Sequence, residues 1–157
     1  MKTAPNYNAS MLVIAVDFDG TIVTNEYPRI GREIPFAIET LKKLQEDLHL
    51  RLILWTVREG KELEEAVKYC RGRGLEFYAV NSNYPEENAN SREARKLKAD
   101  LFIDDRNLGG LPDWGVIYHM IADGKHLSQE ALLEHYSSDA FAETQKKKKG
   151  FLKSIFG

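Results

Sequence analysis

The sequence predicts an α/β fold in three layers, a Rossmann-like parallel sheet with helices on both faces. Short apolar runs rich in β-branched residues alternate with longer segments whose apolar residues recur at helical spacing. Polar residues follow the ends of several runs, where the strands of such a sheet give way to loops. Alternation of this kind is typical of parallel strands joined by helices.

The length and composition suit one domain with a single core. The chain has 157 residues, of which 43% are hydrophobic, and domains of this size are common. We expect the domain to cover residues 11–136, with residues 1–10 and 137–157 as flexible tails, because end segments are ordered only where they dock. The second tail carries four consecutive lysines before an apolar stretch, a pattern that also fits a weak basic amphipathic anchor.

Charge and cysteine content narrow the class of protein. The formal net charge is −2, so no basic field indicates nucleic acid or an anionic membrane as a partner. The single cysteine, Cys70, allows no disulfide within the chain, which fits a reducing compartment. No segment is long enough to span a bilayer, and we therefore expect a cytoplasmic protein.

The first half of the chain is expected to hold two strands, each followed by a helix. A strand at residues 12–17 leads into a loop at 22–34, which is too short for a helical cap domain but long enough for a flap. A helix begins near Pro35, a second strand covers 51–55, and a second helix ends before Gly74. Apolar residues at helical spacing are expected to face the core, namely Ala37, Leu41, Leu44 and Leu48 in the first helix and Leu63, Val67 and Cys70 in the second.

The second half repeats the pattern with shorter segments. We expect strands at 77–80 and 101–103, and a candidate fifth strand at 115–118. A polar helix is expected at 90–97, and Ser128 can cap a last helix that runs to about residue 136.

Two carboxylates follow the first strand, in the segment Asp17-Phe18-Asp19-Gly20-Thr21. Side chains alternate along a strand, so an extended D-x-D sequence directs both carboxylates to one side. Like charges this close favour a bound cation or a raised pKa on one of the acids, and Gly20 allows backbone to approach a ligand closely. The alternative is a strand that ends in an ordinary polar turn, since Asp, Gly and Thr are all common turn residues.

Other polar groups follow later strands and could share the same edge of the sheet. Thr56 and the N–H of Val57 follow the second strand and can hold a phosphate oxygen, while Asp104 and Asp105 follow the fourth. Carboxylate oxygens suit Mg²⁺ better than zinc. Lys96 and Lys98 precede the fourth strand and could supply a positive charge. A metal ion, the ammonium group of a lysine, a hydroxyl group and backbone amides together fit a site for phosphoryl transfer.

These residues, in this order, resemble the haloacid dehalogenase (HAD) superfamily of Mg²⁺-dependent phosphatases. The resemblance covers residues 12–118 and rests on the D-x-D-G-T segment, then Thr56, then a lysine, then Asp104-Asp105. It implies a HAD-like fold and a hydrolase that acts on a phosphorylated substrate. Because no large cap domain is expected, the site should be open, which suits a large substrate or closure by a second copy in a homo-oligomer.

The resemblance also implies a role for each matching residue. Asp17 would be the nucleophile that forms an aspartyl-phosphate, and Asp19 the general acid and base. Asp17, the backbone carbonyl of Asp19, Asp104 and Asp105 would hold Mg²⁺. Thr56 would bind the phosphoryl group together with Lys96, and the lack of a proline after Lys96 keeps Lys98 as a second choice for the lysine. The residues expected to bind the substrate follow the first strand, follow the second strand or precede the fourth, namely Gly20, Thr21, Thr56, Val57, Arg58 and Lys98.

The sequence leaves a second interpretation open. A non-catalytic module that binds phosphate or a partner protein could use the same fold, because fold does not determine function. The presence of both Asp17 and Asp19 favours the phosphatase, since binding alone requires no acid–base carboxylate. The identity of the substrate does not follow from the sequence.

Overall fold

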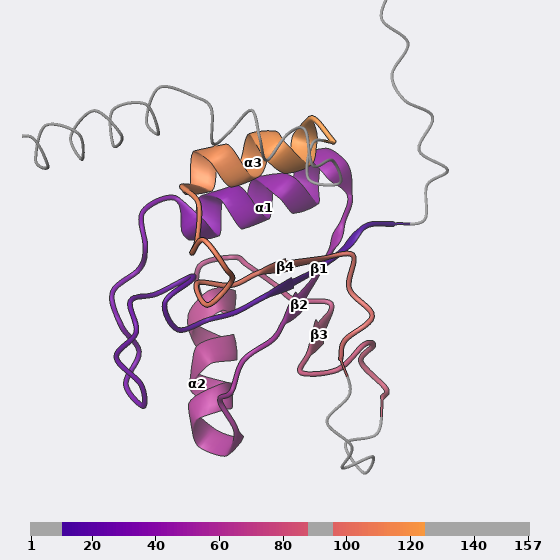
Figure 1. The fold of residues 1–157 in the computed structure, drawn as a ribbon. Helices are drawn as coiled ribbons and strands as arrows, with labels where there is room; N and C mark the ends of the chain where they lie inside the picture. Colours follow the sequence, from indigo (N-terminus) through magenta and orange to yellow (C-terminus); the bar gives the residue numbers. More distant parts are fainter. Residues whose placement is uncertain (1–10, 88–95, 125–157) are drawn as a thin grey trace, which may run out of the picture. The chain divides into compact units, whose positions relative to one another are not determined.

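The structure is a computed structural model that describes residues 11–87 and 96–124. Contacts divide the chain into two compact units, residues 1–116 and 117–157. The chain forms its elements in the order β1 (Val13–Val16), α1 (Ala37–Leu48), β2 (Arg51–Leu54), α2 (Gly60–Arg71), β3 (Ala79–Val80), β4 (Leu101–Ile103) and α3 (Trp114–Ala122) (Figure 1).

Four parallel strands form one sheet in the order β3-β2-β1-β4 (Figure 1). Successive side chains of a strand point to opposite faces, and residues 14–16 of β1 and 52–54 of β2 are all buried. Both faces of the two central strands are therefore covered, as a parallel sheet requires. The Rossmann-like α/β fold predicted from the alternation of elements is confirmed at this level.

The two helices of the first unit follow the predicted apolar stripes in part, since Leu63 and Val67 of α2 are only half-buried. Ala37, Leu41 and Leu44 of α1 are buried, and so is Cys70 of α2. Leu48 was expected in the core but is 38% exposed. It is the last residue of α1, and the chain turns away at His49, whose φ is +52°.

The predicted strand at residues 115–118 is wrong, because this segment lies inside α3. The side chain of Asp113 accepts a hydrogen bond from the Gly115 N–H at 2.8 Å, as a residue that caps a helix N-terminus does. Apolar residues then recur at helical spacing over residues 114, 117 and 121. Most of the predicted helix at 90–97, all of the one at 128–136 and both predicted tails lie outside the described residues, and residues 96 and 97 are not helical.

The region between β1 and α1 holds no helix in the described chain. Residues 17–36 contain isolated bridges, of which Val23 with Glu33 closes the loop at residues 22–34. We call this segment the flap loop. Among residues 11–87 and 96–124, no helix is both long and apolar enough to cross a membrane.

Candidate active site

Three carboxylates meet just beyond the carboxyl ends of β1 and β4. Asp17 follows β1, and its N–H donates to the carbonyl of Ile103 in β4 at 3.0 Å. Asp104 and Asp105 follow β4 directly. One oxygen from each of these three acids lies within 4.8 Å of the other two. The register of the sheet therefore brings together acids that are 87 residues apart in the sequence, as the strand ends predicted.

Gly20 and the side chain of Thr21 position Asp105 in this cluster. Gly20 has a φ of +84°, and a Cβ at this position would lie 2.3 Å from Oδ2 of Asp105. Only a residue without a side chain leaves room for that carboxylate. The hydroxyl of Thr21, which is buried, accepts a hydrogen bond from the Asp105 N–H at 3.1 Å. The predicted site residues Gly20 and Thr21 thus contact the acid cluster from behind.

The electrostatics of the cluster raise the pKa of Asp17 to about 7 from its ordinary value of 3.8. Burial of the carboxyl group is the main cause, and the nearby carboxylates of Asp104, Asp105 and Asp19 add to it. The N–H of Phe18 opposes the shift through a hydrogen bond to the carboxylate. A cation at this point would remove the repulsion between these acids.

The residues fit a hard divalent cation such as Mg²⁺. The donors are carboxylate oxygens, which Mg²⁺ prefers. Oδ1 of Asp105 is buried without a hydrogen-bond partner in the described part of the chain, and such an atom needs a ligand to offset its lost hydration. Asp17, Asp104 and Asp105 are therefore the side chains that could hold the ion. The side chain of Asp19 is not one of this group, and the expected contribution of its backbone carbonyl to the metal site stays a prediction.

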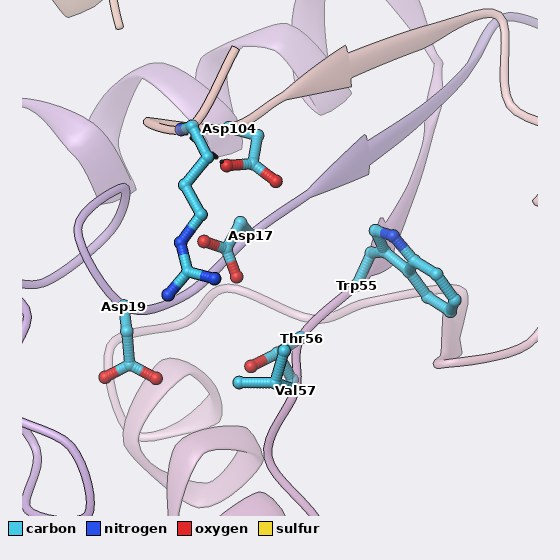
Figure 2. A pocket seen from close by; sticks show the side chains of 7 residues that line it. Asp17, Asp19, Trp55, Thr56, Val57 and Asp104 are labelled. Atoms are coloured by element: carbon cyan, nitrogen blue, oxygen red, sulfur yellow. Dashed lines mark hydrogen bonds between the residues drawn. The ribbon is translucent and has the colours of Figure 1, made fainter. Parts of the chain in front are cut away.

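A pocket of about 300 Å³ opens at the cluster, where Asp17 and Asp104 form part of its wall. Figure 2 shows Asp17 and Asp104 facing it from β1 and β4, with Thr56 across from them and Asp19 at its edge. Seven residues line the pocket, namely Asp17, Asp19, Trp55, Thr56, Val57, Asp104 and Arg106. Val57 is 70% exposed, so the pocket has an accessible apolar rim as well as charged walls.

Asn81, one of the residues that follow the ends of predicted strands and could touch a substrate, fixes the loop that carries Thr56. Its Oδ1 accepts a hydrogen bond from the Thr56 N–H at 2.8 Å, and its Nδ2 donates to the Arg58 carbonyl at 3.4 Å. The Thr56 hydroxyl accepts from the Arg58 N–H at 3.2 Å. Asn81 has a φ of +50°, a conformation that Asn tolerates better than most residues. The signal in the sequence for this role is that Asn81 comes directly after a strand.

Arg58 and Asp19 form a buried ion pair at the pocket's edge. Nε of Arg58 donates to Oδ2 of Asp19, and Nη2 donates to Oδ1, both at 2.7 Å. Arg58 is 0% exposed and Asp19 is 6% exposed. Hydrogen bonding to Asp19 raises the pKa of Arg58 above its usual value. Arg58 was predicted to bind substrate, but it does not line the pocket, because its guanidinium points into the protein.

The positive charge of the pocket comes from an arginine. Arg106 lines the pocket, and its N–H donates to Oδ1 of Asp104 at 2.8 Å. Neither Lys96 nor Lys98 is among the lining residues. The ammonium of Lys96 lies 5.6 Å from the centroid of the Phe102 ring, and the N–H of Lys98 donates to Oδ1 of Asn83 at 2.7 Å. The phosphate-binding role of these lysines stays a prediction.

Comparisons with known proteins give one informative match. Neither a protein-family model nor a curated protein sequence matches the chain. Among solved structures, the chain is similar to one described as the conserved protein coded by a locus from Bacteroides thetaiotaomicron. The two share 63% sequence identity with a TM-score of 0.67, over 76% of this chain and 99% of that chain.

Proposed function

We propose that this chain, which belongs to the same family as that conserved Bacteroides protein, is a Mg²⁺-dependent phosphatase of the HAD-like class. It would hydrolyse a phosphomonoester through an aspartyl-phosphate on Asp17. The observation that carries the proposal is the convergence of Asp17, Asp104 and Asp105 within 4.8 Å, beside a pocket that Thr56 and Arg106 also line. The order of the motifs in the sequence points to the same chemistry.

The first step follows from the positions of Asp17 and Asp19. A carboxylate oxygen of ionised Asp17 attacks phosphorus, and the bond between phosphorus and the leaving oxygen breaks. Asp19, which lines the same pocket, gives its proton to the leaving oxygen. Thr56 and Arg106, which both line the pocket, would hold the phosphoryl oxygens through their hydroxyl and guanidinium groups, because donors at these oxygens stabilise the charge of the transition state.

The second step returns the enzyme to its starting state. A water molecule attacks phosphorus, the bond to the Asp17 oxygen breaks, and Asp19 takes the proton that the water loses. The net reaction consumes one water and yields an alcohol and inorganic phosphate. A bound Mg²⁺, held by Asp17, Asp104 and Asp105, would supply positive charge that neutralises the phosphoryl oxygens.

The test is phosphate release from p-nitrophenyl phosphate with Mg²⁺ and with EDTA. We expect turnover with Mg²⁺ and none with EDTA, and Asp17→Asn should abolish it because the amide is not a nucleophile. Asp47→Asn is the matched control, since Asp47 lies in α1 beside Lys43 and outside the pocket. Mg²⁺ binding without turnover of any phosphomonoester would favour the non-catalytic binding module.

A further inference from the structure

We infer that Arg58 is a positioning residue, which fixes the carboxyl group of Asp19 at the pocket and joins it to the flap loop. The inference rests on the proposed function, because it concerns the residue assigned there as the acid and base. Arg58 itself does not line the pocket, so its effect on the reaction would pass through Asp19.

The guanidinium holds both oxygens of Asp19 at once. Two parallel hydrogen bonds of 2.7 Å join Nε and Nη2 to Oδ2 and Oδ1, and a bidentate pair of this kind fixes the plane of the carboxylate as well as its position. Each carboxylate oxygen keeps a second lone pair. Asp19 also lines the pocket, so its carboxyl group can contact a bound substrate while Arg58 fixes its orientation.

The remaining donors of Arg58 reach the flap loop. Nη1 donates to the Pro28 carbonyl at 2.9 Å, and Nη2 also donates to the Arg29 carbonyl at 2.8 Å. The loop is closed on itself by a hydrogen bond of 2.7 Å from the Thr24 N–H to the Arg32 carbonyl. Arg58 thus connects the far end of a closed loop with the carboxylate that takes part in the reaction.

Two aromatic rings complete the enclosure of Arg58. Its Cζ lies 5.1 Å from the centroid of the Phe18 ring and 5.2 Å from that of Tyr27, distances at which a cation is attracted to the ring face. Phe18, which stands between the two acids of the D-x-D segment in the sequence, is buried. Asp19, two backbone carbonyls of the flap loop and two aromatic rings therefore restrain the guanidinium. The orientation of the guanidinium in turn sets that of the Asp19 carboxyl group.

A buried ion pair gives little net stability, since apolar residues of similar volume serve the fold as well or better. What the pair provides is a fixed carboxylate geometry, and small displacements of reacting groups lower rates strongly, by about 100-fold for 1 Å. A pair at this position is therefore better explained by the reaction than by folding.

The test is a double-mutant cycle in kcat with an activated substrate, 2,4-dinitrophenyl phosphate, on which residual activity can be measured. We expect Arg58→Met to lower kcat by about 100-fold in the wild-type background. In the Asp19→Asn background the same substitution should change kcat by less than about threefold, because effects of residues that act as a unit are not additive. Arg58→Lys, which keeps the charge but not the bidentate bond, should recover part of the activity.

Controls separate positioning from damage to the fold. Lys43→Met removes another ion pair, between Lys43 Nζ and Asp47 Oδ2 at 2.8 Å, which lies within α1 and outside both the pocket and the flap loop, and this variant should leave kcat unchanged. Mg²⁺ affinity, which depends on Asp17, Asp104 and Asp105, reports whether each variant keeps the site folded. A crystal structure of Arg58→Met should show the Asp19 carboxyl group turned from its wild-type orientation.

The outcomes distinguish this inference from the proposed function. Equal factors for Arg58→Met in both backgrounds, or an unmoved Asp19 in the variant that keeps Mg²⁺ affinity, would overturn the inference alone. A wild-type chain that hydrolyses no phosphomonoester would overturn the proposed function, and the positioning role with it.

Discussion

Mg²⁺ should bind this protein more tightly as the pH rises from 5.5 to 7.5. The reason is Asp17, whose pKa is raised to about 7 by burial and by the carboxylates around it. A carboxyl group must lose its proton before it can bind a metal ion, so a proton and Mg²⁺ compete for Asp17.

The size of the effect follows from the pKa. With a pKa of about 7, the ionised fraction of Asp17 is about three quarters at pH 7.5 and about 3% at pH 5.5. The apparent dissociation constant for Mg²⁺ should therefore be about 25-fold higher at pH 5.5 than at pH 7.5. An aspartate at its ordinary pKa of 3.8 stays almost fully ionised at both values, and would give no measurable change.

Isothermal titration calorimetry measures both the affinity and the protons released. Titrations at pH 6 in two buffers of different ionisation enthalpy should show release of about one proton for each Mg²⁺ bound. In Asp17→Asn, any binding that remains should lose its pH dependence. An affinity that differs by less than twofold between pH 5.5 and pH 7.5 would refute the electrostatic account of the cluster.

Three further predictions test other parts of the site. Gly20→Ala should lower the free energy of unfolding by about 1–3 kcal/mol, since φ is +84° and the methyl group would overlap Asp105; an unchanged midpoint in urea would contradict this. Arg106→Ala should raise KM for an aryl phosphate by about tenfold, and a larger rise in Lys96→Ala would favour the lysine instead. Without metal, the wild type should lose stability relative to Asp17→Asn as the pH rises from about 4 to 7, because its folded state holds the Asp17 proton more tightly than its unfolded state; parallel curves from urea unfolding in EDTA would contradict this.

The strands could be predicted because their sequence pattern is local. The run at residues 101–103 was predicted with its observed bounds. The strand predicted at 12–17 is one residue too long at each end, the one predicted at 51–55 is one residue too long at its end, and the one predicted at 77–80 begins two residues too early. The prediction for residues 115–118 failed because the three apolar residues at 116–118 fit a strand or a helix equally well. Its helical identity depends on the longer spacing from Trp114 to residue 121 and on the cap from Asp113.

The acid cluster could be predicted because parallel strands end at one edge. The positions where two apolar runs end were enough to predict that Asp17, Asp104 and Asp105 lie close together. The partner of Asp19 could not be predicted, since Arg58 reaches it through a turn and a loop 39 residues later. No period or motif specifies such a contact. The presence of Arg106 in the lining of the pocket likewise depends on the tertiary structure.

The most direct test of the account is the site of covalent phosphorylation during turnover. In Asp19→Asn the second step should be slow, because the attacking water has lost its base, so a phosphoenzyme should accumulate from 2,4-dinitrophenyl phosphate and Mg²⁺. Acid quenching and mass spectrometry of the peptides should place the phosphoryl group on Asp17. Phosphate release that survives Asp17→Asn, or a phosphoryl group on another residue, would contradict the account.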